Sequence, residues 1–140
     1  MDSGYMKQKR ARILSAEDGT IFAISDFADI ADSATVRQSL NRLVQAGILR
    51  RVLRGIFEKP KYSSVLNEFV EVNPDAVAKT LARTFHWTIA SYGNAARYLS
   101  GLSNQRPAIW SYISTGPYRI YKWNSIRIEF KHRTNKEFIR

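Results

Sequence analysis

The segment from residue 25 to residue 60 constrains the fold of this chain more than any other part of its sequence. Apolar residues recur there at helical spacing, which predicts an amphipathic helix from Ser33 to about Ala46. The residues of this apolar face are Val36, Leu40, Leu43 and Val44. Gly47 follows them, and a glycine in the left-handed conformation commonly ends a helix.

A hairpin is predicted immediately after this helix. Ile48 to Leu53 has the composition of a strand, with two arginines in its middle. Arg54-Gly55 forms the turn, and Ile56 to Glu58 is the returning strand, which Pro60 ends.

Three helical or extended segments are predicted upstream. A first helix runs from about Gly4 or Tyr5 to Leu14, and a short edge strand covers Thr20 to Ile24. Ser25 is predicted to cap a short second helix, and Ser33 to cap the amphipathic helix. The inward residues of the second helix are Phe27, Ile30 and Ala31. Three helices followed by a hairpin predict a winged helix-turn-helix over residues 1–60.

The polar face of the amphipathic helix suits DNA recognition. Its residues are Arg37, Gln38, Asn41, Arg42 and Gln45. Arginine side chains pair with guanine, and asparagine and glutamine pair with adenine, in the major groove. No carboxylate lies on this face, so nothing there repels phosphate, whereas a helix face that is merely solvated normally mixes both signs.

Phosphate contacts are expected at two further places. Ser33 and Thr35 lie at the start of the helix, where hydroxyls, backbone N–H groups and the helix dipole favour an anion. Arg54 and Gly55 form the tip of the wing, and Arg50 is favoured over Arg51 because consecutive strand residues point to opposite sides. The predicted DNA-binding residues are therefore Ser33, Thr35, Arg37, Gln38, Asn41, Arg42, Arg50, Arg54 and Gly55.

Charge is sorted along the first 60 residues. The chain has 22 Lys and Arg against 12 Asp and Glu, a net charge of +10, which favours a polyanionic partner. Leu14 to Asp32 holds five acids and no Lys or Arg, whereas Ser33 to Pro60 holds six basic residues and one acid. Because residues from 61 onward supply +7 of the total, the sorting supports DNA binding here better than the net charge does.

Residues 61–140 predict a second, α/β domain, so the fold class is α+β. Asn73-Pro74-Asp75 is a helix start, with Val77, Leu81 and Phe85 on the buried side. Ser91 is expected to cap another helix ending near Leu99. The predicted strands are Ile109–Ser114, Tyr118–Trp123 and Ser125–Lys131. Tyr62 to Val72 is ambiguous and is interpreted as a connector with a turn of helix.

Two blocks of sequence resemble the AbiEi-type antitoxins of type IV toxin–antitoxin, or abortive infection, systems. The first block runs from Ser33 through Arg37-Gln38 and Asn41-Arg42 to Val52, with Ser25-Asp26-Phe27 before it and Arg54-Gly55-Ile56-Phe57 and Pro60 after it. The second block consists of Asn94-Ala95-Ala96, Gly101-Leu102-Ser103 and Ser114-Thr115-Gly116. The resemblance covers nearly the whole chain, and the second block is the more specific.

The resemblance implies a bacterial, DNA-binding autorepressor. Its winged helix would bind inverted repeats in the operon's promoter, and its second domain would counteract a nucleotidyltransferase-like toxin. Members of the family are usually somewhat longer, so the resemblance also implies a second domain truncated at its C-terminus. Neither the operator sequence nor the oligomeric state follows from the sequence.

Other functions stay open. The winged helix could instead dock on a protein such as the toxin. A nuclease would need Glu129 and Lys131, whose spacing fits an E-x-K pair, but strand alternation produces that spacing often. Residues 118–123 interleave aromatic and basic side chains, which fits either a stacking surface for single-stranded nucleic acid or, as we favour, alternating core and solvent faces.

No enzyme, cofactor or metal site is predicted. The sequence has no cysteine, and neither His86 nor His132 has a carboxylate at helical spacing that would suggest a metal site. His86 is interpreted as a helix-end or core residue. No apolar run approaches the length of a membrane span, and residues 1–11 lack the apolar stretch of a signal peptide, so a cytoplasmic protein is expected.

Overall fold

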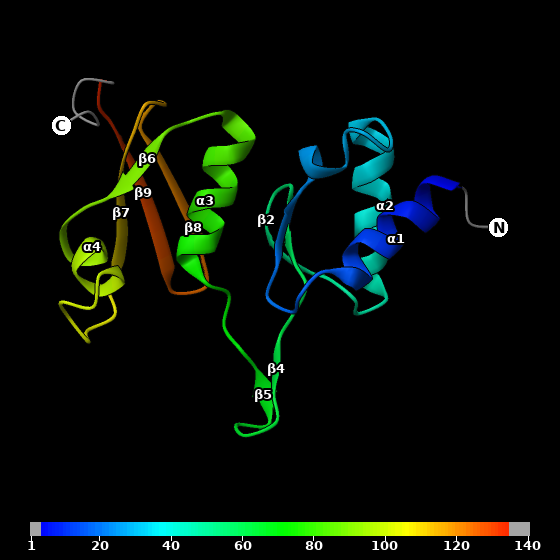
Figure 1. Cartoon of the computed structure of the whole chain (residues 1–140), viewed down its shortest axis with the longest axis horizontal. Coiled ribbons are helices and arrows are strands. Elements are labelled where there is room, and N and C mark those ends of the chain that lie inside the picture. Colours follow the sequence, from blue (N-terminus) through cyan, green and yellow to red (C-terminus); the bar gives the residue numbers. More distant parts are fainter. Residues whose placement is uncertain (1–3, 135–140) are drawn as a thin grey trace. The chain divides into compact units, whose positions relative to one another are not determined.

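The computed structural model describes residues 4–134 and has a mixed α+β architecture (Figure 1). The chain divides into two compact units, Met1–Asn73 and Pro74–Arg140. We call them unit 1 and unit 2.

Unit 1 combines helices with a small antiparallel sheet. Its helices are α1 (Gly4–Ser15), the 3₁₀ helix η1 (Ile24–Phe27) and α2 (Ser33–Gln45). Its larger sheet has the strand order β1-β3-β2, with β1 at Ile21–Ala23, β2 at Arg50–Leu53 and β3 at Ile56–Glu58. The predicted edge strand before residue 25 and the predicted hairpin after α2 are both confirmed, with β3 at the centre of the sheet.

An apolar core joins these elements. It is built from Met6, Ile13, Phe22, Phe27, Ile30, Val36, Leu40, Leu43, Leu49 and Phe57. The predicted apolar face of α2 is confirmed, since Val36, Leu40 and Leu43 are almost completely buried and Val44 is partly buried. Gly47 has a φ of 79°, and its successor Ile48 donates to the Leu43 carbonyl at 2.9 Å, so the helix ends as predicted.

The segment before α2 differs from its prediction. No α-helix begins at Ser25; η1 is a single 3₁₀ turn that starts one residue earlier, and the chain then turns through residues 28–30. The Asp26 carboxylate accepts from the Ala23 backbone N–H at 2.9 Å, so an acid in the turn does the capping that Ser25 was expected to do. Phe27 and Ile30 still enter the core, because a 3₁₀ turn also brings residues three apart to one side.

Residues 61–72 form a hairpin and contain no helical turn. Strands β4 (Tyr62–Ser63) and β5 (Glu68–Phe69) pair antiparallel, and Figure 1 shows the hairpin standing clear of the helices of unit 1. The sequence predicts a domain boundary after residue 60, whereas unit 1 extends to Asn73. The hairpin is tied to unit 1 by Arg50, whose Nη2 donates to the Val70 carbonyl at 3.0 Å.

Unit 2 is a four-stranded sheet with two helices. The helices are α3 (Pro74–Phe85) and α4 (Gly93–Leu99). The strand order is β6-β7-β9-β8, with β6 at Ile89–Ser91, β7 at Ile109–Ser114, β8 at Arg119–Trp123 and β9 at Ile126–His132. The central β7–β9 pair is parallel, and the β6–β7 and β8–β9 pairs are antiparallel. The predicted helix start at Asn73-Pro74-Asp75 is confirmed, with Pro74 as the first helical residue.

Both helices cover the same face of this sheet. Trp110 and Tyr112 of β7 share that face with Ile128 and Phe130 of β9, and all four are buried. The Tyr112 hydroxyl donates to Asp75 Oδ1 of α3 at 2.7 Å, and Tyr98 of α4 packs edge-on against Trp110 with ring centroids 5.7 Å apart. Ser91 lies in β6 and does not cap α4, whose N-cap is Tyr92 with no capping side chain.

None of the helices in residues 4–134 is long and apolar enough to pass through a membrane.

Candidate nucleic-acid interface

Helix α2 presents one polar face to solvent. Its exposed residues fall at positions i, i+1, i+4, i+5 and i+8, which share one side of a helix. They are Arg37, Gln38, Asn41, Arg42 and Gln45. None of these side chains has a hydrogen-bond or ion-pair partner within residues 4–134, so their donors and acceptors are available to a ligand.

The N-terminus of α2 carries a carboxylate. The N-cap is Asp32, not Ser33 as predicted; its Oδ1 accepts from the Thr35 backbone N–H at 2.8 Å. This hydrogen bond holds the pKa of Asp32 below its usual range, so the cap is charged at neutral pH. Ser33 is exposed in the first turn and Thr35 is half-buried, but one backbone donor expected to receive phosphate is already occupied.

A buried lysine anchors α2 from below. Lys9 of α1 is completely buried, and its Nζ donates to Ser39 Oγ of α2 at 2.8 Å. Ser39 Oγ in turn donates to the Thr35 carbonyl at 3.0 Å. Burial lowers the pKa of Lys9, partly offset by the nearby Asp32 carboxylate. This buried polar contact fixes α2 against α1. The hydrophobic periodicity of the sequence does not predict it.

An ion pair anchors the last turn of α1. Arg12 makes a two-pronged contact with the Asp29 carboxylate, at 3.0 and 2.8 Å, and also donates to the Asp26 carbonyl at 2.8 Å. The contact holds the pKa of Asp29 below its usual range. The acids of the segment before α2 are thus engaged locally, with Asp26 and Asp32 serving as caps.

The β2–β3 turn places the predicted wing tip at the surface. Arg54 is exposed, and Gly55 adopts a φ of 78°, a conformation that favours glycine. The Gly55 carbonyl accepts from the Ile24 backbone N–H at 3.3 Å, which holds the turn against the start of η1. Arg54 has no partner among the residues that the structure describes.

Arg50 and Arg51, of which the sequence favours Arg50 for contact with DNA, differ in their contacts within unit 1. Arg50 lies opposite Glu58 in the sheet and forms an ion pair with it, its Nε donating to Oε1 at 3.1 Å. Burial raises the pKa of Glu58, and Arg50 opposes that rise by stabilising the charged form. Because Arg50 also holds the Val70 carbonyl, its guanidinium serves the structure of unit 1. Arg51 is exposed and has no partner in the described part of the chain.

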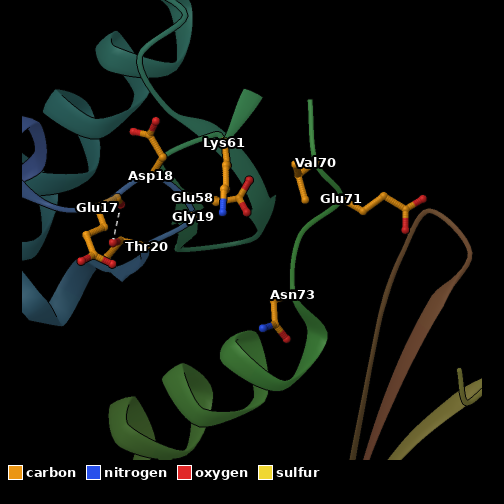
Figure 2. Close-up of a pocket in the computed structure, with 9 residues that line it drawn as sticks. All are labelled: Glu17, Asp18, Gly19, Thr20, Glu58, Lys61, Val70, Glu71 and Asn73. Atoms are coloured by element: carbon orange, nitrogen blue, oxygen red, sulfur yellow. Dashed lines mark hydrogen bonds between the residues drawn. The ribbon is translucent and has the colours of Figure 1, made fainter. Parts of the chain in front are cut away.

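A pocket of unit 1 that lies away from the exposed face of α2 is lined mainly by acidic residues. Figure 2 shows that Glu17, Asp18, Glu58 and Glu71 line this pocket together with Lys61, and that the carboxylate of Glu71 points away from the other three. The cavity measures about 370 Å³. No group of His, Cys, Asp or Glu within residues 4–134 has the geometry to hold a metal ion. The carboxylates disfavour an anion, so this cavity does not extend the α2 surface.

The aromatic and basic strand of unit 2 divides between two faces. Tyr121 of β8 lies opposite the buried Ile128 and packs edge-on against Phe130 at 6.0 Å, whereas Ile120 and Lys122 point to the face that the helices leave open. The favoured interpretation, alternating core and solvent faces, agrees with this register. Tyr118 alone among these aromatics lies beside the open face, where its hydroxyl donates to Glu129 at 3.2 Å.

The residues considered for a nuclease have other contacts. Glu129 receives hydrogen bonds from Tyr118 and from Arg127, the latter at 3.1 Å. Lys131 is exposed two residues further along β9. His86 is an exposed residue with a φ of 59° after α3, which agrees with its interpretation as a helix-end residue. His132 Nδ1 lies 2.8 Å from the Gly116 carbonyl.

The Ser114-Thr115-Gly116 block forms a tight junction in unit 2. Ser114 Oγ accepts from the Gly116 backbone N–H at 3.0 Å, and Thr115 exchanges backbone and side-chain hydrogen bonds with Thr88. A Cβ atom on Gly116 would lie 2.3 Å from the Trp87 ring, so no larger residue fits there. These residues therefore have a packing role.

Comparisons with known proteins found neither a curated protein nor a solved structure that matches this chain. A family model does match, over residues 8–140, and it describes a family of unknown function, DUF6088. The match spans both units, from within α1 to the last residue, and the chain belongs to the DUF6088 family.

Proposed function

We propose that unit 1 is a winged helix-turn-helix that binds double-stranded DNA, with α2 entering the major groove. The observation that carries the proposal is the surface of α2, where five exposed polar residues lie on one side and apolar residues anchor the other. The order of the elements also supports it, since α1, β1, η1 and α2 precede the β2–β3 hairpin and β1 completes the sheet.

Recognition would divide between bases and backbone. Arg37 and Arg42 suit guanine, and Gln38 and Asn41 suit adenine, because their side chains match the donor and acceptor patterns of those bases. Arg54 and Arg51 are both exposed on the β2–β3 hairpin and would contact phosphate. The Asp32 carboxylate would oppose phosphate at the N-terminus of α2, so we assign phosphate binding to the hairpin more than to Ser33 and Thr35.

The resemblance to AbiEi-type antitoxins extends this proposal. It implies an autorepressor that binds inverted repeats in its own promoter and counteracts a nucleotidyltransferase-like toxin. We therefore expect the adjacent downstream gene to encode such a toxin. Growth arrest caused by that toxin should be relieved when this chain is co-expressed, and unrelieved arrest would contradict the antitoxin part of the proposal.

DNA binding is tested by fluorescence anisotropy with the duplex upstream of the coding sequence and a scrambled duplex of equal composition. We expect a preference of roughly 1,000-fold or more for the upstream duplex, the usual margin of a specific site. Arg37→Ala and Asn41→Ala should each cost roughly 1–3 kcal/mol on the upstream duplex and reduce the preference. Arg10→Ala, which removes an exposed arginine from α1, is the matched control.

Equal affinity for the two duplexes would rule out a sequence-specific repressor. If the preference survives in both α2 variants, another surface reads the DNA. A stable complex with the toxin that is unaffected by Arg37→Ala and Arg54→Ala, together with no DNA preference, would instead identify unit 1 as a protein-docking module.

A further inference from the structure

The open face of the unit 2 sheet is the side that α3 and α4 leave uncovered. Its residues alternate along each strand with those that enter the core. On the two central strands they form an aliphatic column on β7 directly beside a charged column on β9. The register pairs across these columns are Ile109 with Arg127, Ser111 with Glu129, and Ile113 with Lys131.

The aliphatic column is unlike the solvent side of an ordinary sheet. Ile109 is 39% exposed, and Ile113 is half-buried. Parallel strands are usually covered on both faces, whereas antiparallel sheets often leave one face to water. Because the central pair of this sheet is parallel and isoleucines line its uncovered side, this face suits a covering partner.

The charges of this face are unbalanced. Lys122 of β8 lies directly opposite Arg127 of β9, and like charges in that position destabilise a sheet. Neither Lys122 nor Lys131 has a hydrogen-bond or ion-pair partner within residues 4–134. Glu129 is the one carboxylate on the face in the described part of the chain, and it already accepts from Tyr118 and Arg127. Two cations therefore lack a counter-charge.

Arg127 adds an unsatisfied donor. Its Nη2 donates to Glu129 at 3.1 Å, but its Nε is buried and has no acceptor. A buried donor without an acceptor is costly, and a guanidinium binds a carboxylate best through two parallel N–H groups. A partner carboxylate beside Lys122 would supply the missing acceptor once the guanidinium turns toward it.

These features fit a partner that is both acidic and apolar. Unit 2 has 11 Lys and Arg against three Asp and Glu, a net charge of +8, so the same face of a second copy would be repelled. Surfaces for single-stranded nucleic acid stack bases on aromatic side chains, and the open side of β7 and β9 holds none. The phosphate backbone of a duplex would leave the aliphatic column in water. A protein surface with carboxylates next to aliphatic groups matches both columns.

We propose that the open face of the unit 2 sheet docks a protein partner whose surface combines carboxylates with aliphatic side chains. The carboxylates would lie against the three cations of the face, and the aliphatic groups would cover the β7 column. This inference does not depend on DNA binding by unit 1.

The test is a selection from a library of random peptides displayed on phage, with the immobilised full chain as bait. We expect the enriched peptides to combine acidic with aliphatic residues. A synthetic copy of an enriched peptide should bind Lys122→Glu at least about tenfold more weakly than wild type, because the reversed charge repels its carboxylates. Arg97→Glu, at an exposed arginine of α4, is the matched charge reversal away from this face and should leave peptide binding unchanged.

The stability of the free chain gives a second readout. Lys122→Glu replaces a like-charge pair with an opposite-charge pair across β8 and β9. The thermal midpoint of unit 2 should therefore rise by about 1–5 °C while peptide binding weakens. A variant that is more stable but binds less is typical of a site retained for a partner. A lower midpoint would contradict the charge argument.

Three outcomes of the selection would overturn the proposal. The first is that no peptide is enriched, and the second is that the enriched peptides lack acidic residues. The third is that they bind Lys122→Glu and Arg97→Glu equally well. Saturable binding of a single-stranded oligonucleotide of mixed sequence that is lost in Lys122→Glu, with no acidic peptide enriched, would assign this face to nucleic acid instead.

Discussion

Units 1 and 2 contain the same number of basic residues but differ in how charge is arranged. Each has 11 Lys and Arg; unit 1 has nine Asp and Glu, and unit 2 has three. In the described part of unit 1 most of the acids cap helices, pair with arginines or line one cavity, and the polar face of α2 carries no carboxylate. In unit 2 the exposed basic residues are spread over α3, α4 and the sheet. Net charge alone would favour unit 2 as the DNA-binding unit, whereas the local arrangement of charge favours unit 1.

The first test of this comparison is a substitution that destabilises unit 2. Gly116→Ala should destabilise it by roughly 1–3 kcal/mol, because the new methyl group would overlap the Trp87 ring. Thermal unfolding followed by tryptophan fluorescence measures this effect, since the three tryptophans, Trp87, Trp110 and Trp123, all lie in unit 2. Gly101→Ala, at a position with open space but a φ of 83°, controls for glycine strain. An unchanged midpoint in Gly116→Ala would contradict the packing argument.

A second variant removes the buried hydrogen bond between Lys9 and Ser39 in unit 1. Ser39→Ala removes the hydrogen-bond partner of the buried Lys9 ammonium and should cost about 1–3 kcal/mol. Chemical denaturation followed by circular dichroism is the measurement. Adding Lys9→Met to Ser39→Ala should recover much of the loss, because the unpaired charge disappears. Losses that simply add in the double variant would show that the two side chains do not interact.

The stability of unit 1 should also depend on pH through the buried Lys9. Burial holds the pKa of Lys9 below its unfolded value, so the folded state binds this proton more weakly than the unfolded state does. Stability should therefore rise as the pH increases between the folded and unfolded pKa values. The free energy of unfolding of wild type should rise relative to that of Lys9→Met over that alkaline interval, and a fall relative to Lys9→Met would have the wrong sign.

A third test concerns the basic excess of unit 2. Lys122 and Lys131 are exposed on the open face of the sheet. If unit 2 contributes to DNA binding, it does so through phosphate, and Lys122→Gln with Lys131→Gln should weaken upstream and scrambled duplexes equally. Each lost contact should reduce the slope of log affinity against log salt by about 0.9. A loss of affinity for the upstream duplex alone would contradict this comparison of the two units. It would show that unit 2 takes part in sequence recognition.

The smallest expected effect comes from Asp32. Asn caps a helix about as well as Asp, so Asp32→Asn should keep α2 intact while removing the carboxylate at its N-terminus. Affinity for DNA should rise roughly twofold to fivefold at low salt, and the gain should fade as salt screens the charge. Asp29→Asn, at a carboxylate engaged by Arg12, is the control. Lower affinity in Asp32→Asn would place this carboxylate in a favourable contact.

Local signals explain what could be predicted from sequence. The apolar spacing of α2, Gly47 after it and the Arg54-Gly55 turn each act within a few residues, and all three appear in the structure. The start at Asn73-Pro74 succeeded for the same reason. These features depend on backbone conformation and periodicity, which neighbouring residues largely determine.

The features that were not predicted from the sequence depend on distant residues or on a selection between equivalent ones. Asp32 and Ser33 are both good caps, and their order gave no reason to prefer the acid. The partner of Arg50 is Glu58 across the hairpin, and that of Lys9 is Ser39 on another helix. The β4–β5 hairpin was missed because its strands are only two residues long and its apolar residues face solvent, which gives no alternating pattern.

Selection of binding sequences from a pool of random duplexes tests the central claim most directly. The full chain should enrich one common sequence motif from the pool. The double variant Arg37→Ala with Asn41→Ala should lose that enrichment while retaining salt-sensitive binding to the pool as a whole. Enrichment of the same motif by the double variant, or of no motif by the wild-type chain, would contradict the account of α2 as the helix that reads DNA.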